Sequence, residues 1–369
     1  MKVIVVSGAN LYSGGTLTIL QDCVTFLDTQ LSGNYKIFVI VNDINKFNKS
    51  DKINFIELKN SRNSYIHRLY YEFFYFYKIS KKLRPYFWLS LNDISPNIIS
   101  EKRAVYCHNP SPFRKASFKD LYFQKQLFFF TLFYKFLYQI NIKKNNYVVV
   151  QQNWIRNSFC KMFSLSEDQV ILFPPQIPNS LRIIENVAGI NVETKKMITF
   201  FYPTLSRPFK NIELICEAIK ILKKNKNPYF KVIITIDGTE NNYSKNIIKK
   251  YSNYQEIEFI GHISREEVFK YYDLSDCLIF PSTLETWGLP ITEFKLFGKP
   301  IILSDLEYAH ETLGNYDKCV FINPFDPFDL ASKLKSFLNN EIVFQTNSEI
   351  NYKEPIAHNW DHFFKIVLD

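Results

Sequence analysis

Glycine is scarce in this sequence, with 10 among 369 residues, whereas roughly 7% would be usual. The motif Gly-x-Gly-x-x-Gly does not occur, which argues against a dinucleotide-dependent oxidoreductase. The sequence also has no Asp-x-Asp pair and no cluster of histidine with carboxylates, so we expect no metal site. Each glycine is expected where the backbone needs a positive φ or a close approach to another group.

The sequence also lacks closely spaced cysteine pairs and apolar stretches long enough to span a membrane. The six cysteines lie far apart, and no Cys-x-x-Cys pair is present, which predicts reduced thiols and a cytoplasmic protein. The longest apolar stretch, which begins at Gln126, is interrupted by Lys135 and is shorter than the ~20 residues that span a bilayer. The apolar N-terminal run ends in a turn signal, and we interpret it as a buried strand.

Positive charge is concentrated in one segment. The formal net charge is +9, yet residues 62–144 hold 15 Lys/Arg and 4 Asp/Glu, a local +11 that leaves −2 elsewhere. The segment is also rich in Phe and Tyr, a composition more typical of a surface for an anionic membrane than of a nucleic-acid binder. The alternative is that the aromatic residues fill the core of this half while the lysines are simply solvated.

Short β-branched or aromatic runs alternate with helical-period segments in both halves, which predicts βαβ units with parallel sheets. We predict an N-terminal domain over 1–178, a polar linker over 179–195 that follows the three prolines of FPPQIPNS, a second domain over 196–345 and a C-terminal segment over 346–369. Two doubly wound domains that face each other would bind ligands in a central cleft at the carboxyl ends of their strands. The predicted strands are KVIVVS, YKIFVIV, INFIEL, FWLSL, AVYCH, YVVVQ and VILF, followed by MITFFY, KVIITI, IEFIG, CLIF, KPIILS and CVFIN.

The most informative stretch is FPSTLETWGLPITEFKLFGKPIILSD, residues 280–305. Proline after Gly288 and Leu289 suits the first turn of a helix, whose free amides would bind a diphosphate. Glu285 precedes this helix and Glu293 lies within it, with seven residues between them. In isolation such a pair is more often an ordinary helix with one glutamate near its start and another on its solvent face.

Two cations follow an earlier strand in FFYPTLSRPFKNIELICEAIK, residues 200–220. Arg207 and Lys210 lie on the loop between the strand and an amphipathic helix. A guanidinium and an ammonium there would stabilise the charge that develops on a departing diphosphate. Two surface cations beside a helix start are the plainer alternative.

The N-terminal half offers four further candidates. Gly14 and Gly15 separate the first strand from the first helix and would let backbone amides approach a substrate. His108 follows a strand in AVYCHNPSPF, where it is either a ligand or a structural histidine. Asp93 ends another strand in SLNDISP, where it would orient an acceptor hydroxyl or, more simply, cap a turn.

Residues 280–305 resemble the Glu-x7-Glu signature of glycosyltransferase family 4, including the Gly-Leu-Pro between the glutamates and the Gly-Lys-Pro-Ile-Ile strand after them. The resemblance implies that Glu285 faces the donor sugar and that Glu293 binds the ribose hydroxyls. It further implies a GT-B architecture, diphosphate contacts from Arg207 and Lys210, a donor or acceptor contact from the Gly-Gly loop and a sugar contact from His108. The spacing of Arg207 and Lys210 is tighter than the Arg-x4-Lys common in the family. The tail from His358 looks like the family's last helix, which returns to the N-terminal domain.

These observations predict a retaining, metal-independent glycosyltransferase without a cofactor, which uses a nucleotide-diphosphate sugar as donor. The acceptor would be a saccharide or lipid-linked saccharide of a bacterial surface polysaccharide such as O-antigen or capsule, and the protein would lie peripherally on the inner face of the plasma membrane. A nucleotide-sugar epimerase or a phosphorylase of the same fold is the first alternative. A non-catalytic membrane scaffold is the second, although it would have no use for Glu285.

Overall fold

The structure is a computed structural model that describes residues 1–113, 118–123, 125–176, 197–223 and 230–369. The chain forms two compact units. The first unit comprises Met1–Phe113, Phe130–Gln176 and Tyr352–Asp369, and the second comprises Arg114–Phe129 and Ile177–Asn351. The predicted linker over 179–195 lies outside the described residues.

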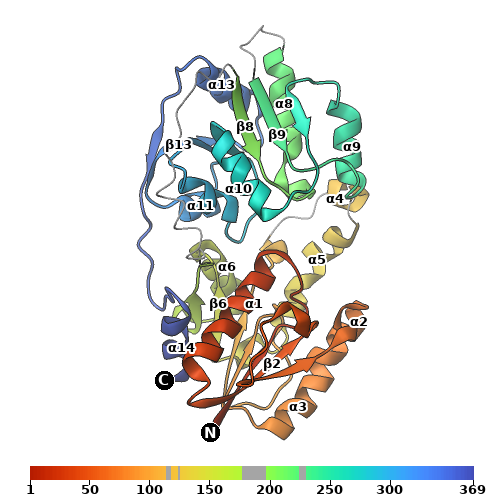
Figure 1. Cartoon of the computed structure of the whole chain (residues 1–369), viewed down its shortest axis with the longest axis vertical. Coiled ribbons are helices and arrows are strands. Elements are labelled where there is room, and N and C mark those ends of the chain that lie inside the picture. The colour runs from red at the N-terminus through yellow and green to blue at the C-terminus, as the bar shows by residue number, and fades with distance from the viewer. Residues whose placement is uncertain (114–117, 124, 177–196, 224–229) are drawn as a thin grey trace. The chain divides into compact units, whose positions relative to one another are not determined.

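The first unit is built on a seven-stranded parallel sheet with the order β3-β2-β1-β4-β5-β6-β7 (Figure 1). The order of its first six strands is that of the Rossmann fold. Each strand overlaps one of the runs from which it was predicted, because strands covered on both faces are mainly apolar. The strands are β1 (Lys2–Ser7), β2 (Tyr35–Val41), β3 (Ile53–Glu57), β4 (Phe87–Ser90), β5 (Lys102–Tyr106), β6 (Tyr147–Val150) and β7 (Val170–Leu172).

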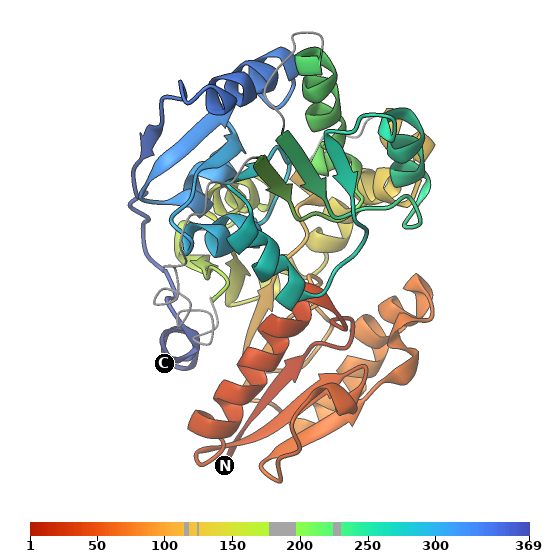
Figure 2. The ribbon, with the colours of Figure 1, turned by 45° about the horizontal axis from the view of Figure 1, so that its top comes forward.

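Helices cover both faces of this sheet. On one face, α1 (Gly14–Phe26) and α14 (Trp360–Leu368) share a core cluster with Val6 and Leu89; α1, in red, runs along the strands in Figure 2. On the opposite face lie α2 (Tyr65–Tyr70) and α3 (Phe76–Leu83), which a π-helical turn at Tyr71–Tyr75 joins into one continuous helix. The same face carries α5 (Lys125–Gln139) and α6 (Asn153–Phe163).

The second unit contains another seven-stranded sheet, ordered β10-β9-β8-β11-β12-β13-β14. Six of its strands are parallel and match the predicted apolar runs, whereas β14, the polar segment Gln-Thr-Asn, pairs antiparallel to β13. Two parallel-sheet Rossmann-like units confirm the predicted fold class. The strands are β8 (Ile198–Tyr202), β9 (Phe230–Ile234), β10 (Ile257–Phe259), β11 (Cys277–Phe280), β12 (Ile301–Ser304), β13 (Tyr316–Ile322) and β14 (Gln345–Asn347).

The helices of the second unit begin where local sequence satisfies their first amides. Ser264 and Glu267 form a capping box at α10 (Arg265–Leu274), and Asp326 caps α13 (Pro327–Leu338) ahead of its proline. Phe200 contacts Phe337 of α13, whereas its neighbour Phe201 packs on α10, so these two helices cover opposite faces. The remaining helices are α8 (Ile212–Lys223), α9 (Asn242–Tyr251), α11 (Leu289–Lys295) and α12 (Glu307–Leu313).

Two segments belong to a unit other than that of their sequence neighbours. The helix α4 (Phe118–Phe123), which we assigned by sequence to the N-terminal domain, groups with the second unit, where Phe123 packs edge-on against Tyr243. Residues from Tyr352 onward group with the first unit, because the buried Arg156 donates hydrogen bonds to the carbonyls of Lys353 and Glu354. Within the described part of the chain, no helix has the combined length and apolar character needed to cross a bilayer.

Candidate active site

Lys210 and Glu285 meet at the carboxyl edge of the second sheet. Lys210 lies on the loop after β8 and Glu285 on the loop after β11, and these two strands are neighbours. The Lys210 Nζ is 2.5 Å from the Glu285 Oε1, and the two side chains are only 16% and 11% exposed. The structure therefore joins two residues that are 75 positions apart in the sequence. Each of them was predicted separately as a site residue.

Hydrogen bonds hold these two loops together. Tyr202 Oη donates to the carbonyl of Lys210 at 2.7 Å, and the amide of Thr283 donates to the carbonyl of Phe209 at 2.8 Å. Asn211 has a positive φ of 58°, and its Nδ2 donates to the carbonyls of Pro281 and Pro324. Each bond ties the loop that carries Lys210 to a neighbouring strand end. The ammonium group is thus attached to a fixed backbone.

Arg207 lies on the same loop but is exposed. It occupies the position before the short 3-10 turn Pro208–Lys210, with extended backbone. Its carbonyl accepts a hydrogen bond from the amide of Lys210. The structure thus places both predicted cations on one loop, and Lys210 contacts Glu285. A diphosphate contact from Arg207 stays a prediction.

Glu293 is buried within α11 and holds two partners. Its Oε1 accepts from Nη2 of Arg265 at 2.8 Å, and its Oε2 accepts from Oη of Tyr272 at 3.0 Å. Burial raises the pKa of this carboxyl, while the Arg265 charge and the Tyr272 hydrogen bond oppose the shift. Glu293 therefore lies inside the fold rather than on the solvent face of its helix. Since each oxygen has a second lone pair, it remains able to accept from a ribose hydroxyl.

The loop before α11 requires glycine at position 288. Gly288 has a φ of +91°, and a Cβ there would lie 3.1 Å from the Cδ1 of Ile291. Leu289 begins α11 and Pro290 follows it, as the sequence predicted. The helix has only seven residues, so its dipole is small compared with that of a long helix. A diphosphate contact from the amides of Gly288 and Leu289 stays a prediction.

The first unit carries the other predicted residues. Gly14 and Gly15 open α1; Gly14 has a φ of +66°, and a Cβ there would meet nothing within 4 Å. The preceding Ser13 makes no side-chain hydrogen bond to the helix. The free space beside Gly14 is compatible with the predicted close approach of a substrate.

The imidazole nitrogens of His108 are shielded from solvent. Both imidazole nitrogens are buried, and neither makes a hydrogen bond of normal geometry to the described residues. The ring packs on Tyr106, with centroids 4.3 Å apart. Burial lowers the pKa of His108, although the charge of Asp93 opposes the shift. A neutral imidazole able both to donate and to accept suits the predicted contact with sugar hydroxyls.

Asp93 is the centre of a buried polar network that the sequence indicated only in part. Its Oδ1 accepts from the amides of His108 at 2.5 Å and Asn109 at 3.1 Å, which is the capping role considered for it. Tyr138 Oη also donates to Oδ1, and Tyr134 Oη donates to Oδ2, each at 3.3 Å. Asp93 thus fixes the backbone that carries His108. Its contact with an acceptor stays a prediction.

Two further charged residues, Arg68 and Glu72, make hydrogen bonds beside this network. Arg68 donates from Nη2 to the carbonyl of Asn92 and to Tyr134 Oη. Glu72 is 1% exposed, accepts a hydrogen bond from Nδ2 of Asn92 at 2.9 Å, and has its pKa raised to about 8 by burial. In the sequence, the only sign that Arg68 and Glu72 interact is their spacing of four residues, which places them one helical turn apart. We had treated both only as part of the basic segment.

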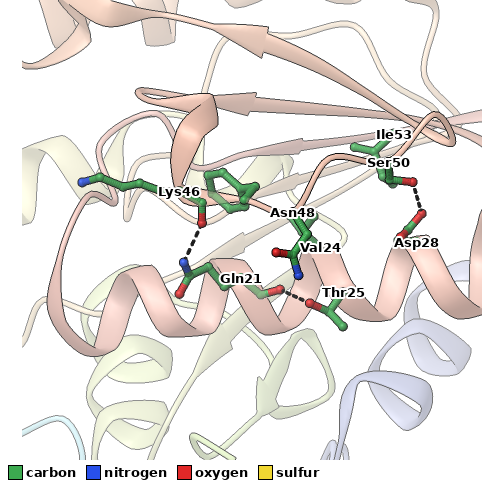
Figure 3. Close-up of a pocket in the computed structure, with 9 residues that line it drawn as sticks. Gln21, Val24, Thr25, Asp28, Lys46, Asn48, Ser50 and Ile53 are labelled. Atoms are coloured by element: carbon green, nitrogen blue, oxygen red, sulfur yellow. Dashed lines mark hydrogen bonds between the residues drawn. The ribbon is translucent and has the colours of Figure 1, made fainter. Parts of the chain in front are cut away.

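A separate hollow of about 180 Å³ lies between α1 and the residues that follow β2 (Figure 3). Two hydrogen bonds join α1 to the residues that follow β2 here: Gln21 donates from Nε2 to the carbonyl of Lys46, and Ser50 donates to Asp28. None of the residues predicted for the site lines it. It is therefore not part of the candidate active site.

Comparisons with known proteins show what the chain is similar to. Residues 183–354 match the family model described as Glycosyl transferases group 1. The O-antigen chain mannosyltransferase RfbU of Salmonella typhimurium is 23% identical over 235 residues, which cover 63% of this chain and 60% of that protein. The chain thus spans less than two thirds of the length of this curated relative.

Solved structures extend the likeness to both units. Sucrose-phosphate synthase from Thermosynechococcus elongatus superposes with a TM-score of 0.64 at 13% identity, covering 92% of this chain and 90% of that one. The Anabaena protein Alr3699/HepE in complex with UDP-glucose gives a TM-score of 0.57 at 12% identity, covering 92% and 89%. At such identities the structures establish the fold alone. Residues 183–354 therefore match the model of the glycosyl transferases of group 1, and the chain shares the fold of two Rossmann-like units with these solved structures.

Proposed function

We propose that this protein is a retaining glycosyltransferase that moves a sugar from a nucleotide-diphosphate sugar to a saccharide or lipid-linked saccharide acceptor. The observation that carries the proposal is the Lys210–Glu285 pair, at the strand ends of the group 1 region. Transfer to O-antigen or a similar bacterial surface polysaccharide is supported by the likeness to the Salmonella O-antigen chain mannosyltransferase. We place this transfer at the cytoplasmic face of the membrane. A nucleotide-sugar donor is supported by the UDP-glucose bound to the Anabaena protein.

The chemistry assigned to Lys210 follows from its charge and burial. When the bond between the sugar and the diphosphate breaks, the electron pair goes to the diphosphate oxygen and negative charge accumulates there. An ammonium group in a partly dry site stabilises that charge more strongly than water does. Lys210 would supply this stabilisation with Arg207 from the same loop, so no metal ion is required.

Glu285 has two roles in this scheme. Without donor, it neutralises Lys210 and so offsets the cost of holding a mostly buried cation. With donor bound, it would accept hydrogen bonds from the sugar hydroxyls and hold the reacting carbon in place. Glu293 would bind the ribose and His108 the sugar, as the family resemblance implies.

The first experiment measures thermal shifts with UDP, GDP, dTDP and their sugars, because a ligand that binds only the folded state raises Tm. The sugar that binds is then offered with a saccharide acceptor, with and without EDTA, and the anomeric configuration of the product is read by NMR. We expect retained configuration and transfer that survives EDTA. Loss of transfer that added magnesium or manganese restores would contradict the metal-independent scheme.

Variants then test the role of Glu285. Glu285→Gln should keep the nucleotide-induced thermal shift and lower the rate of transfer by about 100-fold or more, because one electrostatic contact to the reacting centre is lost. Glu258→Gln is the matched control, since Glu258 also pairs with a lysine, Lys231 at 3.3 Å, but on an exposed strand. Unchanged transfer by Glu285→Gln would refute the assignment. Nucleotide release without acceptor, or a requirement for phosphate, would indicate an epimerase or a phosphorylase instead.

A further inference from the structure

Two helices of the first unit expose apolar side chains in regular stripes. One stripe runs along the continuous helix α2–α3. The other follows α5. Every side chain in the two stripes is at least 39% exposed. We call the two stripes together the apolar face; its members are Ile66, Tyr70, Phe74 and Tyr77 on the first helix and Leu132, Phe133, Phe136 and Ile140 on the second.

The stripes lie on the outward sides of their helices. Along α2–α3, the buried residues Glu72, Phe76 and Ser80 recur every four positions and form the inner side of the helix. The exposed stripe occupies its outer side. On α5, Tyr134 and Tyr138 are buried and the apolar face occupies the opposite side. The core therefore already has its own aromatic layer, and the apolar face is additional to it.

Both helices cover the same face of the sheet. Trp88 and Ser90 are two residues apart on β4, so they point to one side, and Ser90 is paired with Val105 of β5. Phe76 of α3 packs on Trp88, and Tyr138 of α5 belongs to the cluster around Val105. The two exposed stripes therefore both point away from this face of the sheet.

The exposed charges within residues 65–84 and 130–144, which carry the apolar face, are all positive. Residues 65–84 and 130–144 contain a single acidic residue, Glu72, and it is 1% exposed. The exposed basic residues in these two ranges are Lys78, Lys81, Lys82, Arg84, Lys135, Lys143 and Lys144. A surface that joins aromatic side chains to cations alone matches the interfacial zone of an anionic bilayer, where rings enter the headgroup region and lysines pair with lipid phosphates.

We propose that the apolar face is the surface by which this protein docks on an anionic lipid bilayer. Charge decides between this partner and a second copy of the chain. Two copies that paired through this face would bring like-charged lysines together without an exposed acidic residue in these ranges to offset them, whereas anionic lipid headgroups neutralise them. The inference does not depend on the proposed transfer reaction, since it concerns binding alone.

The test is co-sedimentation of the full chain with vesicles of phosphatidylcholine alone or mixed with phosphatidylglycerol. We expect binding to the mixed vesicles at low salt, no binding to the neutral ones, and release at about 0.5 M NaCl. Each lysine near an anionic surface changes partitioning about fivefold, so Lys78→Gln, Lys81→Gln and Lys82→Gln together should lower it by about 100-fold. The control replaces Lys49, Lys245 and Lys249, which are exposed elsewhere.

A second variant separates the apolar contribution from charge. Phe74→Ser with Phe136→Ser should reduce binding at every salt concentration, whereas Phe325→Ser with Phe328→Ser, which changes two exposed rings of the second unit, should not. Unfolding curves recorded for each variant establish that it is folded. Failure of the unaltered protein to bind anionic vesicles, or equal losses in variant and control, would overturn the proposal. If the protein self-associates and the Phe74→Ser/Phe136→Ser variant does not, the partner of the apolar face is a second copy of the chain, and the proposal of a lipid partner is overturned.

Discussion

The ion pair between Lys210 and Glu285 gives a quantitative prediction about stability. At 2.5 Å and an effective dielectric constant of about 20, two unit charges attract by about 7 kcal/mol. Desolvation of two mostly buried ions offsets most of this attraction, but removal of one partner leaves the other charge uncompensated. We therefore expect Lys210→Met to lower the free energy of unfolding by about 3–5 kcal/mol. For a unit of this size, 3 kcal/mol corresponds to a fall in Tm of roughly 6–12 °C.

A double-mutant cycle isolates the pair from the individual substitutions. Lys210→Met and Glu285→Gln should together cost less than the sum of the two single variants, by about 1–3 kcal/mol, because the double variant contains no unpaired charge. Thermal and urea unfolding of the four proteins provide the measurement. As a control, the exposed pair Lys365–Asp361, with side chains 67% and 57% exposed, should contribute no more than about 1 kcal/mol. Strictly additive losses at Lys210 and Glu285 would refute the pairing.

Two further predictions concern buried carboxyl groups. Glu293→Ala should weaken nucleotide binding, because a ribose hydroxyl would lose its acceptor and Tyr272 would lose the partner of its buried hydroxyl; equal dissociation constants by calorimetry would contradict this role. Glu72 has a pKa of about 8 in the folded state and an ordinary value of 4.5 when unfolded, so the native state binds the proton more tightly. Its contribution to stability is therefore greatest below pH 4.5 and falls, by up to about 5 kcal/mol, as pH rises to about 8. Glu72→Gln should remove this dependence in urea unfolding at pH 5 and pH 9, and identical pH profiles for the two proteins would argue against it.

Most of the fold was predictable because the strands are buried on both faces. The runs 3–6 and Cys277–Phe280 are apolar throughout, and helices such as α10 carry their own caps. The strand β14 was missed because its sequence, Gln-Thr-Asn, is polar and short and is held only at one edge. The grouping of α4 with the second unit has no local signal, because its packing against Tyr243 depends on a partner far along the chain.

The site was predictable to the extent that motifs are local. Gly288, Leu289 and Glu293 occupy the positions that their spacing indicated. The pairing of Lys210 with Glu285 was not predicted, since it depends on β8 and β11 being neighbours in the sheet. The network around Asp93 was missed for a similar reason, because Tyr134 and Tyr138 belong to an aromatic run in which inward and outward residues cannot be told apart by type.

The inner and outer sides of α5 make different contacts, and these contacts determine what a shift of this helix would disturb. Its inner tyrosines, Tyr134 and Tyr138, donate to the same carboxylate, Asp93, that holds the amide of His108. Its outer side carries Phe133 and Phe136 in contact with solvent. A displacement of α5 along its axis must either break the two tyrosine hydrogen bonds or carry Asp93 and the His108 backbone with it. A displacement of α5 therefore reaches the loop that carries His108 by two routes, through Asp93 and through the contact between Tyr138 Oη and the backbone of Asn109.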